Sequence, residues 1–126
     1  MDSVTLAFLG DAFYELMVRR KLTESGRSLA ADKLHRSAVR YVKAPSQALA
    51  IRAMVSRGTL SEEEAEVVRK ARNRKPKTVP KNTDPLDYKL ATALEALLGY
   101  HYAAGNFERA EGLAHIAMEI IEEGSN

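Results

Sequence analysis

The chain has no cysteine and no tryptophan, and aromatic residues make up only 6% of its 126 positions. The absence of cysteine excludes disulfide bonds, thiolate catalysis and zinc sites built on sulfur. No apolar run approaches the roughly 20 residues that a membrane-spanning helix needs. The sequence does not open with a basic segment followed by an apolar stretch, as an export signal would. We therefore expect a cytoplasmic protein that is neither exported nor embedded in a membrane.

The sequence does contain enough apolar material for one core. Apolar residues account for 45% of the chain, and 126 residues suffice for one domain but not for two. The net charge of +2 is too small to indicate a nucleic-acid ligand by itself. We predict a single domain over residues 1–126.

Apolar spacing and end signals predict helices along the whole chain, and no strand pattern is present. Ser61-Glu62-Glu63-Glu64 has the form of a capping box, and Asp84-Pro85 combines a capping acid with a proline in the first turn. The expected helices cover about 4–23, 29–42, 45–57, 61–73, 84–105 and 106 onward. The sequence therefore predicts an all-α fold.

Two of these helices are apolar on almost every side, and we expect both in the core. The first nevertheless carries Asp11 and Glu15 one turn apart, and Glu95 is the only charge of the other after Lys89. A buried carboxylate is unfavourable unless a base or a metal ion pairs with it. Because Mg²⁺ and Mn²⁺ prefer carboxylate oxygens, one shared ion would explain both helices. Alternatively each acid pairs with a basic side chain, as Glu15 could with Arg19.

A basic segment that contains no acid leads into the second of these helices. Two prolines and the lack of an apolar period predict an exposed loop over residues 74–84. The cations of the segment are Arg69, Lys70, Arg72, Arg74, Lys75, Lys77 and Lys81. Acidic residues cluster elsewhere, so the charge distribution is uneven, as a phosphate-binding surface requires. A solvated surface without a ligand is the simpler alternative.

Paired motifs in the two apolar helices resemble the signature helices of the ribonuclease III catalytic domain. They are Leu9-Gly10-Asp11-Ala12 and Glu95-Ala96-Leu97-Leu98-Gly99, in the same order as in that family. The resemblance is closer to the bacterial Mini-ribonuclease III branch, whose members consist of this domain alone. Ala7 and Thr92 stand where ordinary family members carry a Glu and an Asp. Only two of the four family carboxylates therefore carry over.

The resemblance implies a metal-dependent endoribonuclease that cuts double-stranded RNA to 5′-phosphate and 3′-hydroxyl ends. Asp11 and Glu95 would be the catalytic residues and the ligands of Mg²⁺, or of Mn²⁺ in its place, with Glu15 as a candidate third ligand. The Mini branch adds an expected substrate, the precursor of large-subunit (23S) ribosomal RNA, and a homodimer in which Phe8 packs into the partner subunit. The residues expected to contact RNA are Arg72, Asn73, Arg74, Lys75, Lys77 and Thr78.

Two other classes of function stay open at this point. Because Ala7 and Thr92 replace acids, the chain also fits a non-catalytic double-stranded RNA-binding or ribosome-associated module. It fits as well a helical interaction protein whose buried acids pair with arginines. Cleavage of a structured RNA, binding without cleavage, or neither would distinguish the three hypotheses.

Overall fold

The computed structural model describes residues 1–26 and 28–124 and folds them into six helices. These are α1 (Ser3–Thr23), α2 (Ala31–Val42), α3 (Ala44–Ser56), α4 (Glu62–Asn73), α5 (Pro85–Ala103) and α6 (Phe107–Gly124). The described residues contain no strand. None of their helices is both long enough and apolar enough to cross a membrane. The predicted all-α class is confirmed, and each helix lies close to its predicted bounds.

Side chains at the helix ends explain where α4 and α5 begin. Ser61 Oγ accepts the Glu64 backbone N–H at 3.1 Å, and Glu64 Oε1 accepts the Ser61 backbone N–H at 2.9 Å. This is the predicted capping box. Asp84 Oδ1 accepts the backbone N–H groups of Leu86 and Asp87 at the start of α5. Because each bond satisfies a donor that the helix leaves free, the local sequence fixes these two starts.

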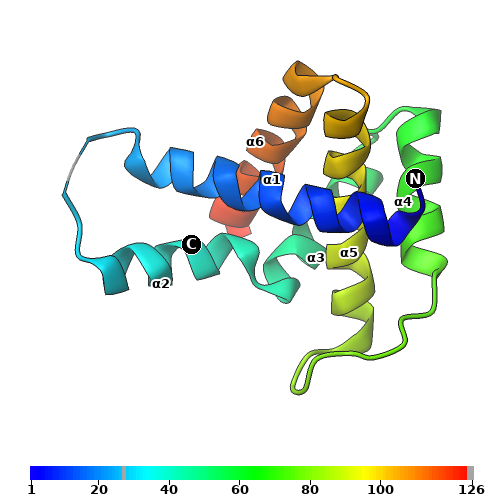
Figure 1. Ribbon diagram of the computed structural model, residues 1–126, viewed down its shortest axis with the longest axis horizontal. Coiled ribbons are helices and arrows are strands. Elements are labelled where there is room, and N and C mark those ends of the chain that lie inside the picture. Colours follow the sequence, from blue (N-terminus) through cyan, green and yellow to red (C-terminus); the bar gives the residue numbers. More distant parts are fainter. Residues whose placement is uncertain (27, 125–126) are drawn as a thin grey trace.

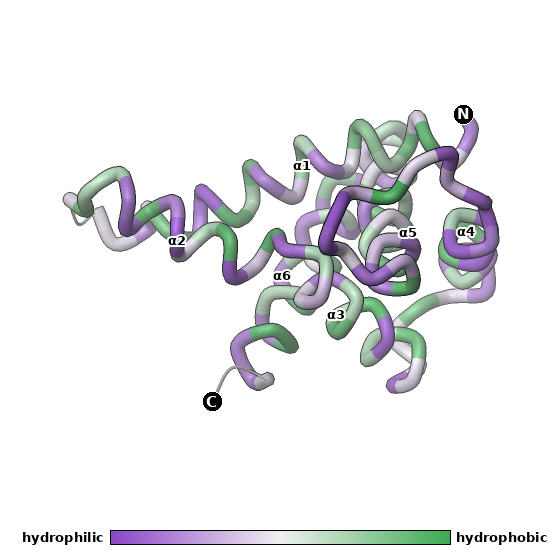
Figure 2. The backbone as a smooth tube through the Cα atoms, turned by 90° about the horizontal axis from the view of Figure 1, so that it is seen from below, coloured by the Kyte–Doolittle hydropathy of each residue, from purple (hydrophilic) through white to green (hydrophobic). Residues whose placement is uncertain are grey.

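Helix α5 lies at the centre of the fold and packs against α1, α3, α4 and α6 (Figure 1). Helix α2 runs back beside the later part of α1, and these two helices extend from the rest as an arm (Figure 2). The largest fully buried side chains are Tyr14, Val18, Ile51, Met54, Leu94, Leu97, Leu98, Leu113, Met118 and Ile121. They come from α1, α3, α5 and α6, so one core holds the central helices together.

The crossing of α1 and α5 depends on two glycines. A Cβ on Gly10 would overlap the backbone carbonyl of Glu95, and a Cβ on Gly99 would overlap the backbone carbonyl of Leu6. Because only glycine lacks this carbon, the two helix backbones can touch at the crossing. The contact places the middle of α1 directly against the turn of α5 that carries Glu95.

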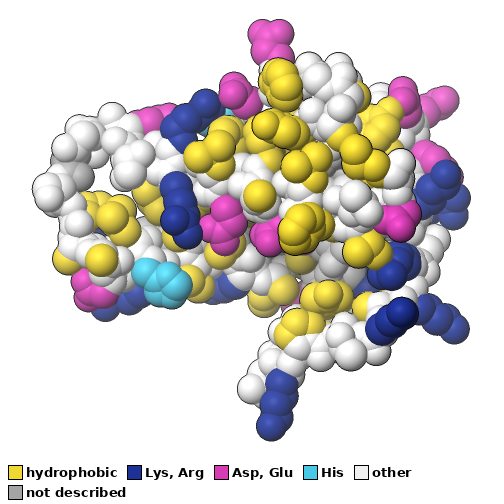
Figure 3. All heavy atoms as spheres, viewed as in Figure 1, with side chains coloured by type: hydrophobic (Ala, Val, Ile, Leu, Met, Phe, Trp, Pro, Cys, Tyr) yellow, Lys and Arg dark blue, Asp and Glu magenta, His cyan; other side chains and the backbone are white. Residues whose placement is uncertain are grey.

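Helix α1 is only partly enclosed in the core, which corrects the expectation from its apolar sequence. Tyr14 and Val18 are fully buried, but Phe8 is 81% exposed and Leu16 is 59% exposed. Figure 3 shows apolar side chains gathered over α1 and the neighbouring ends of α5 and α6. The helix is apolar on all sides because one side faces the core and the other forms an apolar surface. Such a surface on a folded domain is typical of an interaction site.

Candidate functional site

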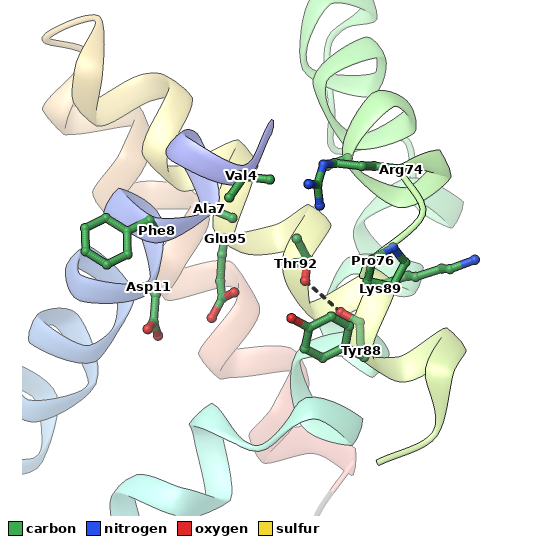
Figure 4. Close-up of a pocket in the computed structure, with 11 residues that line it drawn as sticks. Val4, Ala7, Phe8, Asp11, Arg74, Pro76, Tyr88, Lys89, Thr92 and Glu95 are labelled. Carbon is green, nitrogen blue, oxygen red and sulfur yellow. Dashed lines mark hydrogen bonds between the residues drawn. The ribbon is translucent and has the colours of Figure 1, made fainter. Parts of the chain in front are cut away.

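Asp11 and Glu95 line one pocket of about 240 Å³, bounded by α1, α5 and the segment that follows α4. In Figure 4 both carboxylates extend to the same side of the α1–α5 crossing. Asp11 is exposed at the pocket, whereas Glu95 is half-buried. The fold therefore brings together two acids that are far apart in the sequence.

The environment of Glu95 disfavours its negative charge. Burial raises the pKa of the Glu95 carboxyl to about 8, and the charge of Asp11 and a hydrogen bond shared with it add to the increase. The Gln47 side chain acts in the opposite direction, by hydrogen bonding to the carboxylate. Within residues 1–26 and 28–124, neither Asp11 nor Glu95 forms an ion pair with a base. Two close carboxylates without a basic partner are a donor set that suits a hard divalent cation.

Gln47, at the start of α3, adds a polar group beside Glu95. Its side chain is buried, and Nε2 donates to the backbone carbonyl of Val42 at 2.8 Å. Oε1 is also buried and has no hydrogen-bond partner in the described part of the chain. A buried acceptor without a donor is unfavourable, and here it belongs to a side chain that also hydrogen-bonds to Glu95. No sequence signal points to Gln47, because a single glutamine near a helix start belongs to no motif.

Glu15, the candidate third ligand, does not line this pocket. It forms an ion pair with Arg19 one helical turn later, with 3.6 Å between Arg19 Nε and Glu15 Oε2. This is the pairing that the sequence offered as the alternative. The described residues include no group of three or more His, Cys, Asp or Glu side chains arranged to hold a metal ion. The carboxylates that this pocket offers to an ion are those of Asp11 and Glu95.

The opposite wall of the pocket is basic. Ala7 and Thr92, the two departures from the family pattern, line the pocket but bring no carboxylate. Thr92 Oγ1 donates to the Tyr88 backbone carbonyl at 2.9 Å, so its hydroxyl is used inside α5. Beyond them Arg74 and Lys89 line the pocket. Sequence analysis missed Lys89, because a lysine near a helix start is typical of a solvated surface.

The six residues predicted to contact RNA are all exposed, but two of them, Arg72 and Arg74, line different hollows. Arg74 lines the pocket of Asp11 and Glu95. Arg72, only two residues earlier, instead lines a separate groove between α3, α4 and α5, together with Val55 and Leu86. The loop over residues 74–84 extends below the helices beside α5 in Figure 1. Sequence analysis could not separate the two arginines, because their directions depend on where α4 ends.

The model of the Ribonuclease III domain matches residues 4–106, a range that contains both carboxylates and the whole basic loop. The chain belongs to the ribonuclease III domain family. Within this family it is similar to proteins named Mini-ribonuclease 3. The one from Symbiobacterium thermophilum is 45% identical, over 98% of this chain and 93% of the relative. The one from Thermoanaerobacter sp. is 41% identical, over 98% of this chain and 84% of the relative.

The same ribonuclease III-like fold occurs in a solved structure. A crystal structure of a Fusobacterium nucleatum protein superposes with a TM-score of 0.81, at 30% identity, over 94% of this chain and 93% of the other. These similarities confirm the predicted membership in the Mini-ribonuclease III branch and the predicted class, an endoribonuclease of the ribonuclease III type.

Proposed function

We propose that the domain, spanning residues 1–126, is a cytoplasmic, metal-dependent endoribonuclease that cuts double-stranded RNA to 5′-phosphate and 3′-hydroxyl ends. The observation that carries this proposal is the meeting of Asp11 and Glu95 in one pocket next to a basic loop. Membership in the ribonuclease III domain family supports the reaction type. The precursor of large-subunit (23S) ribosomal RNA is the proposed natural substrate, following the resemblance to the Mini branch.

Asp11 and Glu95 would hold Mg²⁺, or Mn²⁺ in its place, with Gln47 beside Glu95. When bound, the ion lowers the pKa of a coordinated water and polarises a phosphate oxygen. The protein's part is to fix the two carboxylates. Gly10 and Gly99 set the distance between α1 and α5, and the half-buried Glu95 presents its carboxylate to the same pocket as Asp11. Glu15 pairs with Arg19, so we assign it no direct contact with the ion.

The basic segment would contact the RNA, with Arg74 at the pocket and the other residues outside it. Its exposed cations can bind the phosphates of both strands, and its polar groups can reach the 2′-hydroxyls by which A-form RNA is recognised. The residues assigned to RNA contact are Arg72, Asn73, Arg74, Lys75, Lys77 and Thr78. Arg74, at the start of the loop, lines the same pocket as Glu95, so RNA bound by the loop would lie next to Glu95.

We also propose that the protein works as a homodimer through the apolar face of α1. Phe8, with 81% of its surface exposed, projects from this face. A neighbouring apolar hollow is lined by Phe13, Leu16, Tyr102 and Phe107, and it offers a site for such a side chain from a second copy. A symmetric dimer would carry two pockets, one for each strand of a duplex.

Cleavage of a structured RNA in Mg²⁺ tests the catalytic proposal. We expect the wild-type protein to cut, and Asp11→Asn and Glu95→Gln to reduce the rate about a thousandfold, the loss that several kcal/mol of transition-state stabilisation implies. Both variants should still bind the duplex, as measured by fluorescence anisotropy. Undiminished cleavage in either variant would refute the assignment.

The dimer is tested separately, by light scattering during gel filtration. Phe8→Asp should weaken self-association at least about thirtyfold, the effect of losing about 2 kcal/mol at a central apolar contact. Val55→Asp is the matched control, because Val55 is 54% exposed on α3, away from the α1 face. Equal behaviour of the two variants would rule out the α1 face as the interface.

A non-catalytic double-stranded RNA-binding or ribosome-associated module is the second candidate. The observation in its favour is that Ala7 and Thr92 line the pocket without adding carboxylates. This candidate predicts duplex binding with no Mg²⁺-dependent cleavage in the wild-type protein.

A further inference from the structure

The pocket that holds Asp11 and Glu95 has charges of opposite sign on its two sides. The two carboxylates come from the α1–α5 crossing, and Arg74 and Lys89 line the other side. Figure 4 shows that the two cations differ in direction. The Arg74 side chain extends across the pocket toward Val4 and the α1–α5 crossing, whereas the Lys89 side chain extends away from the carboxylates. Arg74 is therefore the cation that faces the acids across the pocket.

The guanidinium of Arg74 is not engaged by an acid of its own chain. Within residues 1–26 and 28–124 it forms no ion pair. The acid whose pKa its charge lowers is Asp2, and there it is a minor cause. The Asp2 carboxylate instead accepts the Thr5 backbone N–H at 2.9 Å and caps α1. Arg74 is thus free to bind an anion that enters the pocket.

The size and charge of the pocket fit a phosphodiester. A pocket of about 240 Å³ holds a phosphate group with its water, and a planar guanidinium can donate two parallel hydrogen bonds to phosphate oxygens. The carboxylates on the other side would repel an anion unless they hold a cation. A cation held by Asp11 and Glu95 would face the phosphate from one side. The Arg74 guanidinium would then supply the positive charge on the other side.

Arg72 provides an internal contrast. It precedes Arg74 by two residues and is equally exposed, yet it lines the groove between α3, α4 and α5. That groove includes Leu86 and Leu90 of α5, whereas the acid pocket includes Lys89, Thr92 and Glu95. The two sets lie on different sides of α5. Arg74 lines the pocket of the two acids, and Arg72 does not.

We propose that Arg74 is a catalytic residue that binds the scissile phosphate inside the pocket, unlike the loop cations that hold the RNA outside it. This inference rests on the proposed nuclease function. Arg74 neutralises charge on the non-bridging oxygens as water adds to phosphorus and the 3′-oxygen leaves. It transfers no proton, because a guanidinium stays protonated at every pH at which the protein is folded. It supplies a fixed positive charge on the side of the pocket where Ala7 and Thr92 bring no carboxylate.

The test compares Arg74→Ala with Arg72→Ala on a short RNA duplex in Mg²⁺. We expect Arg74→Ala to lower kcat on the order of a hundredfold to a thousandfold, as for loss of one donor to a developing negative charge. Its affinity for the duplex should fall only a few-fold, in line with Arg72→Ala. The activity control is Arg57→Ala, whose kcat should stay near wild type because Arg57 ends α3, pairs with Glu123 and lies outside the pocket. Millimolar guanidinium should restore part of the kcat of Arg74→Ala, and urea should not.

Two further measurements separate the ways in which this inference can fail. Asp2→Asn keeps a capping side chain but removes the nearby charge, so a kcat loss equal to that of Arg74→Ala would mean that Arg74 only supports α1. Mn²⁺ binding, measured by calorimetry without RNA, should be the same in Arg74→Ala and wild type. Wild-type protein that neither binds Mn²⁺ nor cuts would overturn the nuclease function itself. Normal cleavage by wild type, with the kcat of Arg74→Ala equal to that of Arg57→Ala, would overturn only the role of Arg74.

Discussion

Glu64 and Glu95 are both turned toward the interior, and their surroundings shift their acidity in opposite directions. Glu64 is 3% exposed, and hydrogen bonds, first from Arg109 and then from the Ser61 backbone and His101, lower the pKa of its carboxyl to about 2. Burial and the neighbouring Asp11 raise the pKa of the Glu95 carboxyl to about 8. The same residue type is therefore fully partnered at one place and lacks a basic partner at the other.

The partners of Glu64 show that it holds the fold together. Two nitrogens of Arg109 each lie 2.8 Å from a Glu64 carboxylate oxygen, and His101 Nε2 lies 2.6 Å from Oε2. His101 is on α5 and Arg109 on α6, so one carboxylate joins α4 to both helices. Burial of an acid does not by itself mark a functional site. A buried acid without a basic partner is the informative case, because the protein tolerates an unfavourable group that a ligand can relieve.

The substitution with the largest expected effect is Gly99→Ala, which should disturb the surroundings of Glu95 but not those of Glu64. The added Cβ would overlap the Leu6 carbonyl and push α1 from α5, separating Asp11 from Glu95 while leaving the Glu64 network in place. We expect the free energy of unfolding in urea to fall by about 3 kcal/mol and the remaining folded protein to lose cleavage.

Gly112→Ala is the matched control for this change. Gly112 lies within α6, and a Cβ there meets no other atom within 4 Å. We expect it to stabilise the protein by about 0.5–1 kcal/mol, the usual gain from replacing glycine inside a helix. If both alanine variants unfolded at the same urea concentration, the close approach of α1 and α5 would not be a requirement of the fold.

The parts of the structure that the sequence predicted are those that local signals determine. The capping box at Ser61, the Asp84-Pro85 start of α5 and the proline-containing loop depend on neighbours within a few residues. The apolar surroundings of the two acids predicted that each needs a partner, either a base or a shared ion, and the pocket lined by both Asp11 and Glu95 fits the shared ion.

The parts that the sequence did not predict depend on packing between distant segments. Packing of the helices leaves Gln47 Oε1 without a hydrogen-bond partner in the described residues. It also brings Glu64 into contact with His101 of α5 and Arg109 of α6. The opposite directions of Arg72 and Arg74 depend on how α4 ends against α5. The sequence does not predict the exposed face of α1 for a related reason. The identity of an apolar residue does not show whether its side chain packs in the core or lies on the surface.

Glu64→Gln should have a smaller effect on the free energy of unfolding than Gly99→Ala. If it had no effect, the contrast between Glu64 and Glu95 would be lost. The substitution removes the charge that faces Arg109 and should lower the free energy of unfolding at pH 7 by about 2 kcal/mol, less than for a wholly buried pair because Arg109 is partly exposed. The matched change Glu95→Gln removes a carboxyl with no basic partner. The free energy of unfolding of Glu95→Gln, measured in EDTA to remove metal ions, should be equal to that of wild type or slightly higher.

The pH dependence of the Glu64 effect follows from the direction of its shift. The pKa of its carboxyl is about 2 in the folded protein, below the ordinary value of 4.5. The unfolded chain therefore takes up the proton first as the pH falls, and the stability that Glu64 contributes is complete above 4.5 and lost between 4.5 and about 2. The difference between wild type and Glu64→Gln should shrink across this window in urea titrations. A difference that stayed constant down to pH 2, or a loss in Glu95→Gln as large as in Glu64→Gln, would mean that the two glutamates do not differ in the way their partners indicate.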